Sequence, residues 1–198
     1  YFTQYTYSPE IRLNGVSTPM FQGATFIAKL TPSGNTIWTK TLEPLGGDII
    51  YVNDHVSDQS NNLYLAGSFS CQRFAFAGDT LKNNPGKNQL FILKYDATGT
   101  PSWILGASAL VDQTAAVAAL NVDKGDNLYA SGNFNSSSLK LGKNNFVNSG
   151  VNTFESFVTK LSRCSAPVAS ICMVSVDSLS QNNVIVWDKA SYTCTSSN

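Results

Sequence analysis

The sequence predicts an all-β fold made of antiparallel, β-propeller-like blades with a period of about 65 residues, since a fixed period somewhat longer than about 50 residues is typical of propellers and related β arrays. Two pairs of segments lead to this prediction. "NNLYLAGSF" at 61–69 recurs as "DNLYASGNF" at 126–134, and "FIAKLTPSGNTIW" at 26–38 recurs as "FILKYDATGTPSW" at 91–103. A shorter third copy, "FVTKL", begins at Phe157, close to one further period after Phe91.

Each period is predicted to contain four or five short strands. These segments are bounded by Asn, Asp and Ser, are rich in Tyr, Leu and Phe, and are joined by turns too short for parallel pairing. We expect 62–70 to pair with 49–57, and 89–96 with 100–108, and the same pattern one period later. The strands of one period are 49–57, 62–70, 73–82, 89–96 and 100–108.

The turns of the two complete copies use matching residues. Thr31 or Asp96 opens the turn after the "FIAKL" or "FILKY" strand, and Gly34 or Gly99 closes it. A side-chain oxygen that binds the backbone ahead of it, followed by a glycine at positive φ, predicts a hairpin. The stretch "SDQSNNLY" and its counterpart "VDKGDNLY" predict a second hairpin turn.

The segment 114–122 tests the repeat against local propensity. "TAAVAAL" at 114–120 favours a helix when taken alone. The register of the repeat, however, places it opposite "IIYVNDH" at 49–55, which is β-branched and aromatic. We therefore predict a strand over 114–122, and its small side chains suit an innermost strand, where blades crowd together.

The composition excludes several classes of partner. Charged residues make up 13% of the 198 residues, and 13 basic side chains balance 13 acidic ones. Binding to nucleic acid or to anionic lipid needs a basic excess, so neither is expected. No apolar run is long enough to span a membrane. Because the chain begins with Tyr1 and has no signal-peptide pattern, we expect an N-terminal region to have been removed or to lie outside this segment.

The four cysteines do not have the C-x-x-C spacing of zinc or redox sites. Cys71 is isolated, whereas Cys164, Cys172 and Cys194 all follow the last repeated segment. Buried free thiols are the favoured interpretation, with a disulfide in the C-terminal segment as the alternative.

The repeated residues resemble a known family, the secreted bacterial β-propeller repeat proteins (SBBP-type repeats) found in Bacteroidetes-like surface proteins. The resemblance covers about residues 1–163, or two and a half blades. Asn61 stands where the family often has Gly, and the last repeat lacks its closing Trp strand. The family implies a secreted or cell-surface location, often within large multidomain proteins, and no particular reaction. The matching residues are Tyr64, Gly67, Phe69, Phe91, Lys94, Gly99, Trp103, Tyr129, Gly132, Phe134, Phe157 and Lys160.

Residues 164–198 break the period. "ICMVSVD" and "NVIVWDK" are predicted strands, and Trp187 is placed like the core Trp of an immunoglobulin- or fibronectin-type sandwich, whose beginning this segment resembles. Such a domain takes about 100 residues and seven strands. We expect a linker and the start of a truncated domain, with completion of the last blade as the alternative.

No catalytic motif is present. His55 is the single histidine, which argues against a Ser-His-Asp triad or a His-rich metal site. His55 and Asp54 lie in a predicted inner strand, where propeller channels place ligand groups, and are weak binding candidates. The repeat partner of His55 is Leu120, which favours a structural role. We predict no catalytic, metal or cofactor-binding residues.

Other polar and aromatic residues have structural interpretations as well. "DKGDN" at 123–127 has some features of a calcium loop but lacks the spacing of an EF-hand, so Asp123 is expected to cap a turn. The repeated lysines, Lys29, Lys94 and Lys160, are expected to recur because the same fold recurs, and not because they form a ladder of ligand-binding groups. Tyr5, Tyr7 and Phe21 could stack on sugars, although packing explains them equally well.

These observations predict a non-enzymatic scaffold or adhesion module, a segment of a larger secreted or cell-surface protein. The alternative is an accessory binding domain of a secreted polysaccharide- or protein-degrading enzyme. The expected partner is a protein or glycan, without nucleic acid, membrane insertion or cofactor. Closed propellers need four to eight blades, so two and a half would leave two open strand edges and two exposed apolar faces. We expect other copies or the rest of a longer chain to cover them.

Overall fold

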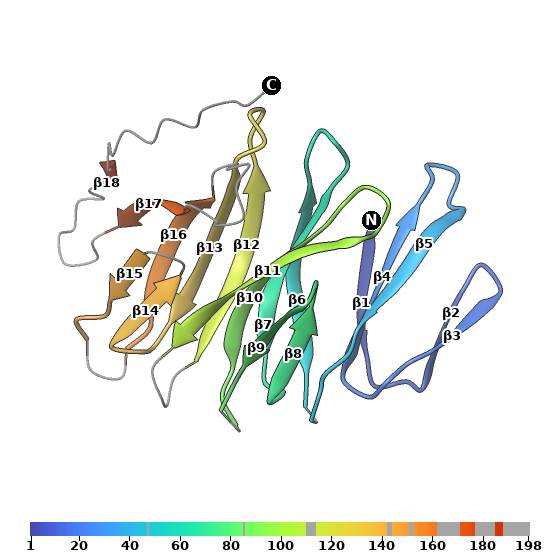
Figure 1. Ribbon diagram of the computed structural model, residues 1–198, viewed down its shortest axis with the longest axis horizontal. Helices are drawn as coiled ribbons and strands as arrows, with labels where there is room; N and C mark the ends of the chain where they lie inside the picture. Colours follow the sequence, from blue (N-terminus) through green and yellow to red (C-terminus); the bar gives the residue numbers. More distant parts are fainter. Residues whose placement is uncertain are drawn as a thin grey trace.

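A computed structural model describes residues 1–46, 48–84, 86–109, 114–141, 144–150, 153–161, 171–176 and 185–187. These residues form strands and turns, and no helix occurs among them, which confirms the predicted all-β class. None of them forms a helix of the length and hydrophobicity that a membrane span requires. Three main sheets lie side by side along the molecule, in the order in which they occur in the sequence (Figure 1).

The N-terminal sheet has three strands in the order β1-β4-β5. All pairs are antiparallel, and a separate hairpin, β2-β3, follows β1. The strands are β1 (Phe2–Thr6), β2 (Glu10–Leu13), β3 (Val16–Pro19), β4 (Ala24–Leu30) and β5 (Thr36–Leu42).

The central sheet has the order β6-β7-β10-β11, again with antiparallel pairs, and the hairpin β8-β9 lies outside it. Its strands and those of the hairpin are β6 (Ile50–Ser57), β7 (Leu63–Phe69), β8 (Arg73–Phe76), β9 (Asp79–Lys82), β10 (Gln89–Tyr95) and β11 (Pro101–Ala109).

The C-terminal sheet has the order β12-β13-β16-β17-β18. The hairpin β14-β15, which follows β13, pairs instead with β11 and so extends the central sheet. These strands are β12 (Ala115–Val122), β13 (Leu128–Phe134), β14 (Ser138–Leu141), β15 (Asn144–Val147), β16 (Glu155–Leu161), β17 (Ile171–Val176) and β18 (Ile185–Trp187).

The strand pairing predicted from the sequence is confirmed in the central sheet, where β6 pairs with β7 and β10 with β11. One period later β12 pairs with β13, so 114–120 contributes to a strand despite its helix propensity. The prediction of one strand over 73–82 was wrong. Ala77 and Gly78 both have positive φ, and the chain reverses there between β8 and β9.

The turn chemistry is also as predicted. Gly34 and Gly99 have φ of 85° and 84°, values that glycine tolerates best. Asp96 accepts hydrogen bonds from the backbone N–H groups of Thr98 and Thr100, both at 2.9 Å. Each turn therefore holds its own backbone polar groups and fixes the register of the hairpin that it closes.

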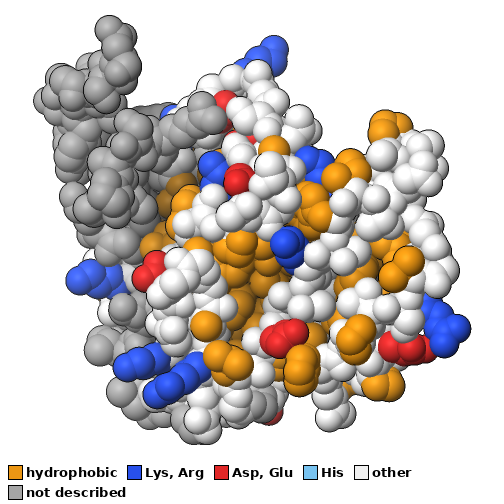
Figure 2. All heavy atoms as spheres, turned by 45° about the vertical axis from the view of Figure 1, so that its right-hand side comes forward, with side chains coloured by type: hydrophobic (Ala, Val, Ile, Leu, Met, Phe, Trp, Pro, Cys, Tyr) orange, Lys and Arg blue, Asp and Glu red, His pale blue; other side chains and the backbone are white. Residues whose placement is uncertain are grey.

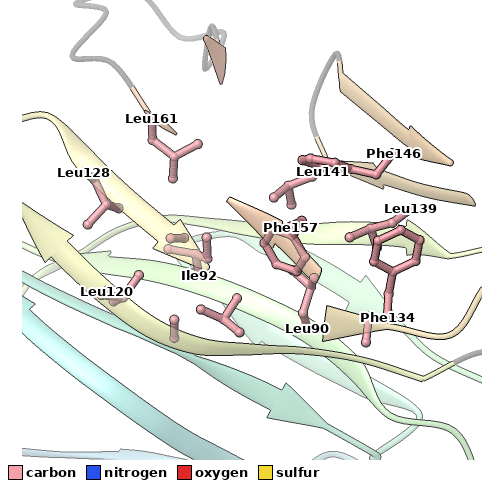
Figure 3. Packing of buried hydrophobic residues seen from close by; sticks show 14 of the residues in the cluster. Leu90, Ile92, Leu120, Leu128, Phe134, Leu139, Leu141, Phe146, Phe157 and Leu161 are labelled. Carbon is pink, nitrogen blue, oxygen red and sulfur yellow. The ribbon is translucent and has the colours of Figure 1, made fainter. Parts of the chain in front are cut away.

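Two apolar cores fill the spaces between neighbouring sheets. Ile27 and Leu42 of the N-terminal sheet pack with Leu65 and Phe91 of the central sheet. Between the central and C-terminal sheets, Figure 3 shows Leu90 and Ile92 beside Phe157, within a cluster to which both sheets contribute. Alternate residues of β10 thus enter different cores, as the pleat of a strand requires.

Cys71 is buried in the first of these cores as a free thiol. Cys164 and Cys194 lie outside the described residues, and of Cys172 only the backbone is described. The structure therefore tests the thiol interpretation at Cys71 alone.

Strand β17 pairs with β16, and β18 pairs with β17, so the described part of 164–198 continues the C-terminal sheet. This is the arrangement expected if these residues complete the last unit. The rest of that segment lies outside the described residues, and the division into a propeller region and a second domain stays a prediction.

The described residues of the two end faces expose less apolar surface than the sequence predicts. Hairpin β2-β3 covers part of the outer face of the N-terminal sheet with Ile11 and Leu13, so that Phe26 is fully buried. The outer face of the C-terminal sheet instead has Ser156 and Asn133 exposed to solvent.

Candidate functional site

The inner-strand candidate Asp54 is used to join two sheets. Strand β6 has a bulge between Val52 and Asp54. The carboxylate of Asp54 accepts the backbone N–H of His55 at 2.8 Å with Oδ1, and that of Leu120 at 2.7 Å with Oδ2. Next to it, Asn53 Nδ2 donates to the carbonyl of Val117 at 2.6 Å. Both oxygens of Asp54 are therefore occupied by backbone donors of β6 and β12.

His55 points the other way, toward β1. Its Nδ1 lies 3.5 Å from the hydroxyl of Thr3, at the long limit of a hydrogen bond. Burial lowers the pKa of His55, while the neighbouring Asp54 carboxylate acts in the opposite direction. Asp54 and His55 are neighbours in the sequence, but their side chains contact different strands. They do not form an acid–base pair.

The turn residue Asp123 is surrounded by hydrogen-bond donors. It accepts the backbone N–H of Asn127 at 2.9 Å, that of Gly125 at 2.8 Å, and the hydroxyl of Tyr129 at 3.0 Å. In the central sheet Asp58 accepts the corresponding hydrogen bonds from the backbone N–H of Asn62 and the hydroxyl of Tyr64. A carboxylate held by N–H and O–H donors caps a turn, as predicted, and is not arranged as a calcium ligand.

Hydrogen bonds from Asn127, Tyr129 and Gly125 lower the pKa of Asp123 to about 2. No group of three or more His, Cys, Asp or Glu residues within the described ranges is arranged to hold a metal ion.

The repeated lysines each lie over a tyrosine ring of their own sheet. The Nζ atoms of Lys29, Lys94 and Lys160 are 5.4, 5.2 and 5.5 Å from the ring centroids of Tyr1, Tyr64 and Tyr129. Lys29 also donates to the carbonyl of Ala97 in the central sheet at 2.9 Å. Cation–π contacts of this kind recur with the fold, so the lysines do not come together as a ligand ladder.

Two of the three candidate aromatics meet in a cluster beside a pocket, which we call the tyrosine pocket. The ring of Tyr5 lies 5.2 Å from that of Tyr7 and 5.3 Å from that of Tyr51, centroid to centroid. Phe21 is exposed and does not line this pocket. The pocket has a volume of about 230 Å³ and is lined by Thr3, Gln4, Tyr5, Thr25, Tyr51 and Val52.

A larger pocket, of about 440 Å³, lies between hairpin β8-β9 and the strands of the central sheet. Its lining combines apolar side chains with amides and one lysine, and includes no acid, histidine or cysteine among the described residues. It consists of Phe69, Thr80, Leu81, Lys82, Asn83, Asn84, Gln89, Gly106 and Ala107. Such a lining can bind through amides and apolar contact, and Lys82 is the one ionisable side chain among the described lining residues.

Charged side chains are spread over the visible surface. Figure 2 shows acidic and basic side chains in several places on this face, with two basic groups next to each other at the lower left, and hydrophobic side chains gathered toward the middle. An ion pair between Arg12 and Glu10 lies within hairpin β2-β3 and is exposed.

Sequence reasoning missed Tyr51, Thr3 and Thr25 as members of the tyrosine pocket. Tyr51 stands in a strand segment whose pattern indicates only a β-strand, and its contact with Tyr5 joins two sheets. A pattern within one strand gives no signal for such a contact.

Two comparisons with known proteins identified no relative of this chain. A scan against protein-family models gives no match, and a search of curated proteins finds no significant similarity to this chain.

Proposed function

We propose that this chain is a non-enzymatic binding and scaffold module of a secreted or cell-surface protein. The observation that carries the proposal is the use of its polar groups. Asp54, Asp58 and Asp123 all have their carboxylates taken up by hydrogen bonds that hold turns and join strands. These three carboxylates are thereby committed to structure, and the two described pockets are lined mainly by aromatic, apolar and amide or hydroxyl side chains.

We further propose that the three sheets are consecutive blades of a partial β-propeller, as in the family that the sequence resembles. Equivalent contacts support this. The N–H of Ile50 donates to the carbonyl of Gly23, and one period later that of Ala115 donates to Asn88. In both places the start of an inner strand is tied to the preceding sheet, which is a contact expected of radially packed blades.

A two-part experiment tests the function. Purified chain is incubated with peptide, ester and polysaccharide substrates, and intact cells of the source organism are treated with protease to detect the protein at their surface. We expect no turnover and rapid loss of the protein from intact cells. Turnover that disappears in His55→Ala, or a protein reached only after lysis, would overturn the proposal.

A further inference from the structure

The larger pocket, which we call the amide pocket, is a feature of the central sheet that the strand ladders do not account for. Strand β9 and the residues that follow it form one side, and β7, β10 and β11 form the other. Its volume of about 440 Å³ lies within the range of pockets that hold small molecules.

Two lining residues of the amide pocket have side-chain amide oxygens without a hydrogen bond. Gln89 is 7% exposed, and its Oε1 has no partner among the described residues. Asn83 Nδ2 donates to the carbonyls of Phe69 and Lys87, at 3.2 and 2.6 Å. Asn83 Oδ1 is buried and has no such partner. Because buried polar atoms of native proteins are nearly always hydrogen-bonded, two open acceptors beside one pocket require an explanation.

The C-terminal sheet shows that the fold itself does not leave such an oxygen open. Asn148 occupies the position of Asn83 one period later, and its backbone N–H makes the equivalent hydrogen bond across its own hairpin. Asn148 Oδ1, however, accepts the N–H of Gly150 at 2.8 Å and the hydroxyl of Thr153 at 3.3 Å. The same position can therefore hold a satisfied amide, and the open oxygen is particular to the central sheet.

Gln89 is also particular to the central sheet. It pairs with Phe69 of β7, and the residue that pairs with the equivalent Phe134 of β13 is Glu155, which is half-buried. The two sheets thus share the strand framework around this position and differ in both amides.

The lining of the amide pocket indicates the kind of ligand that fits. An amide oxygen without a partner needs an N–H or O–H donor. The described lining residues include Lys82 and no carboxylate, which disfavours a metal ion or a cationic donor. The donors that fit are therefore neutral.

A hydroxyl group uses this lining better than an N–H group does. It donates to an amide oxygen and also accepts a hydrogen bond. The exposed side chains of Thr80, Lys82 and Asn84 can supply donors to such a ligand, and Leu81 and Ala107 offer apolar contact to its C–H groups. Several hydroxyl groups on a compact carbon ring, as in a saccharide, match this combination.

We propose that the amide pocket binds a neutral saccharide residue, whose hydroxyl groups donate to the amide oxygens of Gln89 and Asn83. This inference deepens the proposed function and rests on it, because it gives the binding module a ligand class.

Gln89 is the main acceptor, since its amide can turn toward the ligand. The last side-chain bond of a glutamine has broad, two-fold orientations. Because Gln89 Oε1 has no partner, turning the amide breaks no hydrogen bond of that oxygen. The amide of Asn83 is fixed by the two hydrogen bonds that it donates, so its contribution is smaller.

The test titrates the full, isotopically labelled chain with the methyl pyranosides of glucose, galactose, mannose and xylose, followed by NMR of the side-chain amides. We expect saturable shifts of the Gln89 and Asn83 signals with at least one sugar. Gln89→Met keeps the length of the side chain but leaves a ligand hydroxyl without its acceptor, so it should weaken that binding at least tenfold.

Two variants provide the controls. Glu155→Met makes the same substitution at the equivalent position of the C-terminal sheet and should keep the sugar affinity within about twofold. Gln89→Glu keeps an oxygen acceptor of the same shape and should keep it within about fivefold, which separates the role of the acceptor from an effect on folding.

Four results would overturn the inference. They are no saturable shift with any of the sugars, equal weakening by Gln89→Met and Glu155→Met, loss of binding in Gln89→Glu, and binding of N-acetylglutamine amide in place of the sugars, which would assign the pocket to a peptide side chain. None of these results would alter the absence of turnover or the surface location, by which the proposed function is tested.

Discussion

The outer faces of the two end sheets meet water in different ways. On the N-terminal sheet, Phe26 and Ala28 are fully buried because hairpin β2-β3 folds over them, and Phe2 at the edge remains 41% exposed. On the C-terminal sheet the outer face has Ser156 and Val158 on β16, both exposed. Among the described residues, one face is apolar and partly covered by its own hairpin, whereas the other is mostly polar.

The central sheet shows what this difference means. Leu90 and Ile92 of β10 are fully buried against the C-terminal sheet, and the residues at the same positions of β16 are Ser156 and Val158. Terminal units of stacked arrays have polar outer faces because no further unit covers them. Among the described residues, the outer face of the C-terminal sheet is thus more polar than the matching face of the central sheet, and the N-terminal sheet ends in β1, which pairs with β4 alone.

The largest effect should come from exchanging residues between these two environments. Leu90→Ser removes a fully buried side chain and leaves a hydroxyl in an apolar core. We expect it to destabilise the protein by about 3–5 kcal/mol. The reverse change on the outer face, Ser156→Leu, should alter stability by less than about 0.5 kcal/mol.

Urea unfolding of both variants, followed by tryptophan fluorescence, measures this contrast. A loss of similar size in the two variants would mean that the outer face of the C-terminal sheet is packed as tightly as the core, and the comparison would then fail.

A somewhat smaller effect should separate the glycine of the central sheet from its counterpart in the N-terminal sheet. Gly67→Ala places a methyl group against the carbonyl of Tyr51, so β6 must move away from β7. We expect a destabilisation of about 2–4 kcal/mol, within the range of overpacking and of broken backbone contacts. Gln4→Ala, at the matching position on β1, should change stability by less than about 0.5 kcal/mol. Thermal unfolding at one protein concentration provides the measurement, and equal losses would contradict the free edge.

The sequence was sufficient to predict the long strands of the sheets that have an internal copy. The register of the repeat correctly indicated a strand at 114–120 despite the helix propensity of that segment. The matching segment, 49–55, has a clear strand pattern, and the two segments occupy equivalent positions in the fold. The sequence did not predict the reversal at Ala77, since a non-glycine residue with positive φ gives little local signal.

The tyrosine pocket could not be predicted from the sequence for a related reason. Tyr5 and Tyr51 belong to different sheets, and their contact depends on how the sheets stack rather than on the pattern of either strand. Asp54 was correctly singled out as unusual in an inner strand, but its role as a link to Leu120 requires the bulge in β6, which periodicity does not reveal.

The link between inner strands gives a third prediction. Asn53 and Asp54 of β6 reach across to β12, whereas the corresponding residues of β12 are Ala118 and Ala119, which cannot reach outward to a further strand. Asp54→Ala leaves the N–H of Leu120 without its acceptor, so we expect a loss of about 1–3 kcal/mol. Asp54→Asn should lose less because it keeps one oxygen. Chemical denaturation compares the two, and hydrogen exchange at Leu120 should accelerate most in Asp54→Ala. Unchanged exchange there would show that the carboxylate does not hold β12.

The smallest effect concerns the turn of the C-terminal sheet and appears in the acid range. Hydrogen bonds from Asn127, Tyr129 and Gly125 lower the pKa of Asp123 to about 2, below the value of about 3.9 expected in an unfolded chain. A carboxylate with a lowered pKa in the folded state stabilises the protein above the unfolded pKa, and this contribution is lost as the pH falls through the folded pKa.

Asp123→Asn removes this contribution at every pH, so the variant isolates the part of the stability that depends on the ionised carboxylate. The melting temperatures of wild type and Asp123→Asn should therefore differ above about pH 4 and converge as the pH falls to about 2. Tyr129→Phe, which removes one donor, should give a smaller difference in the same window. A gap that stays constant between pH 5 and pH 2, or that widens in acid, would show that the turn is not held by the ionised carboxylate.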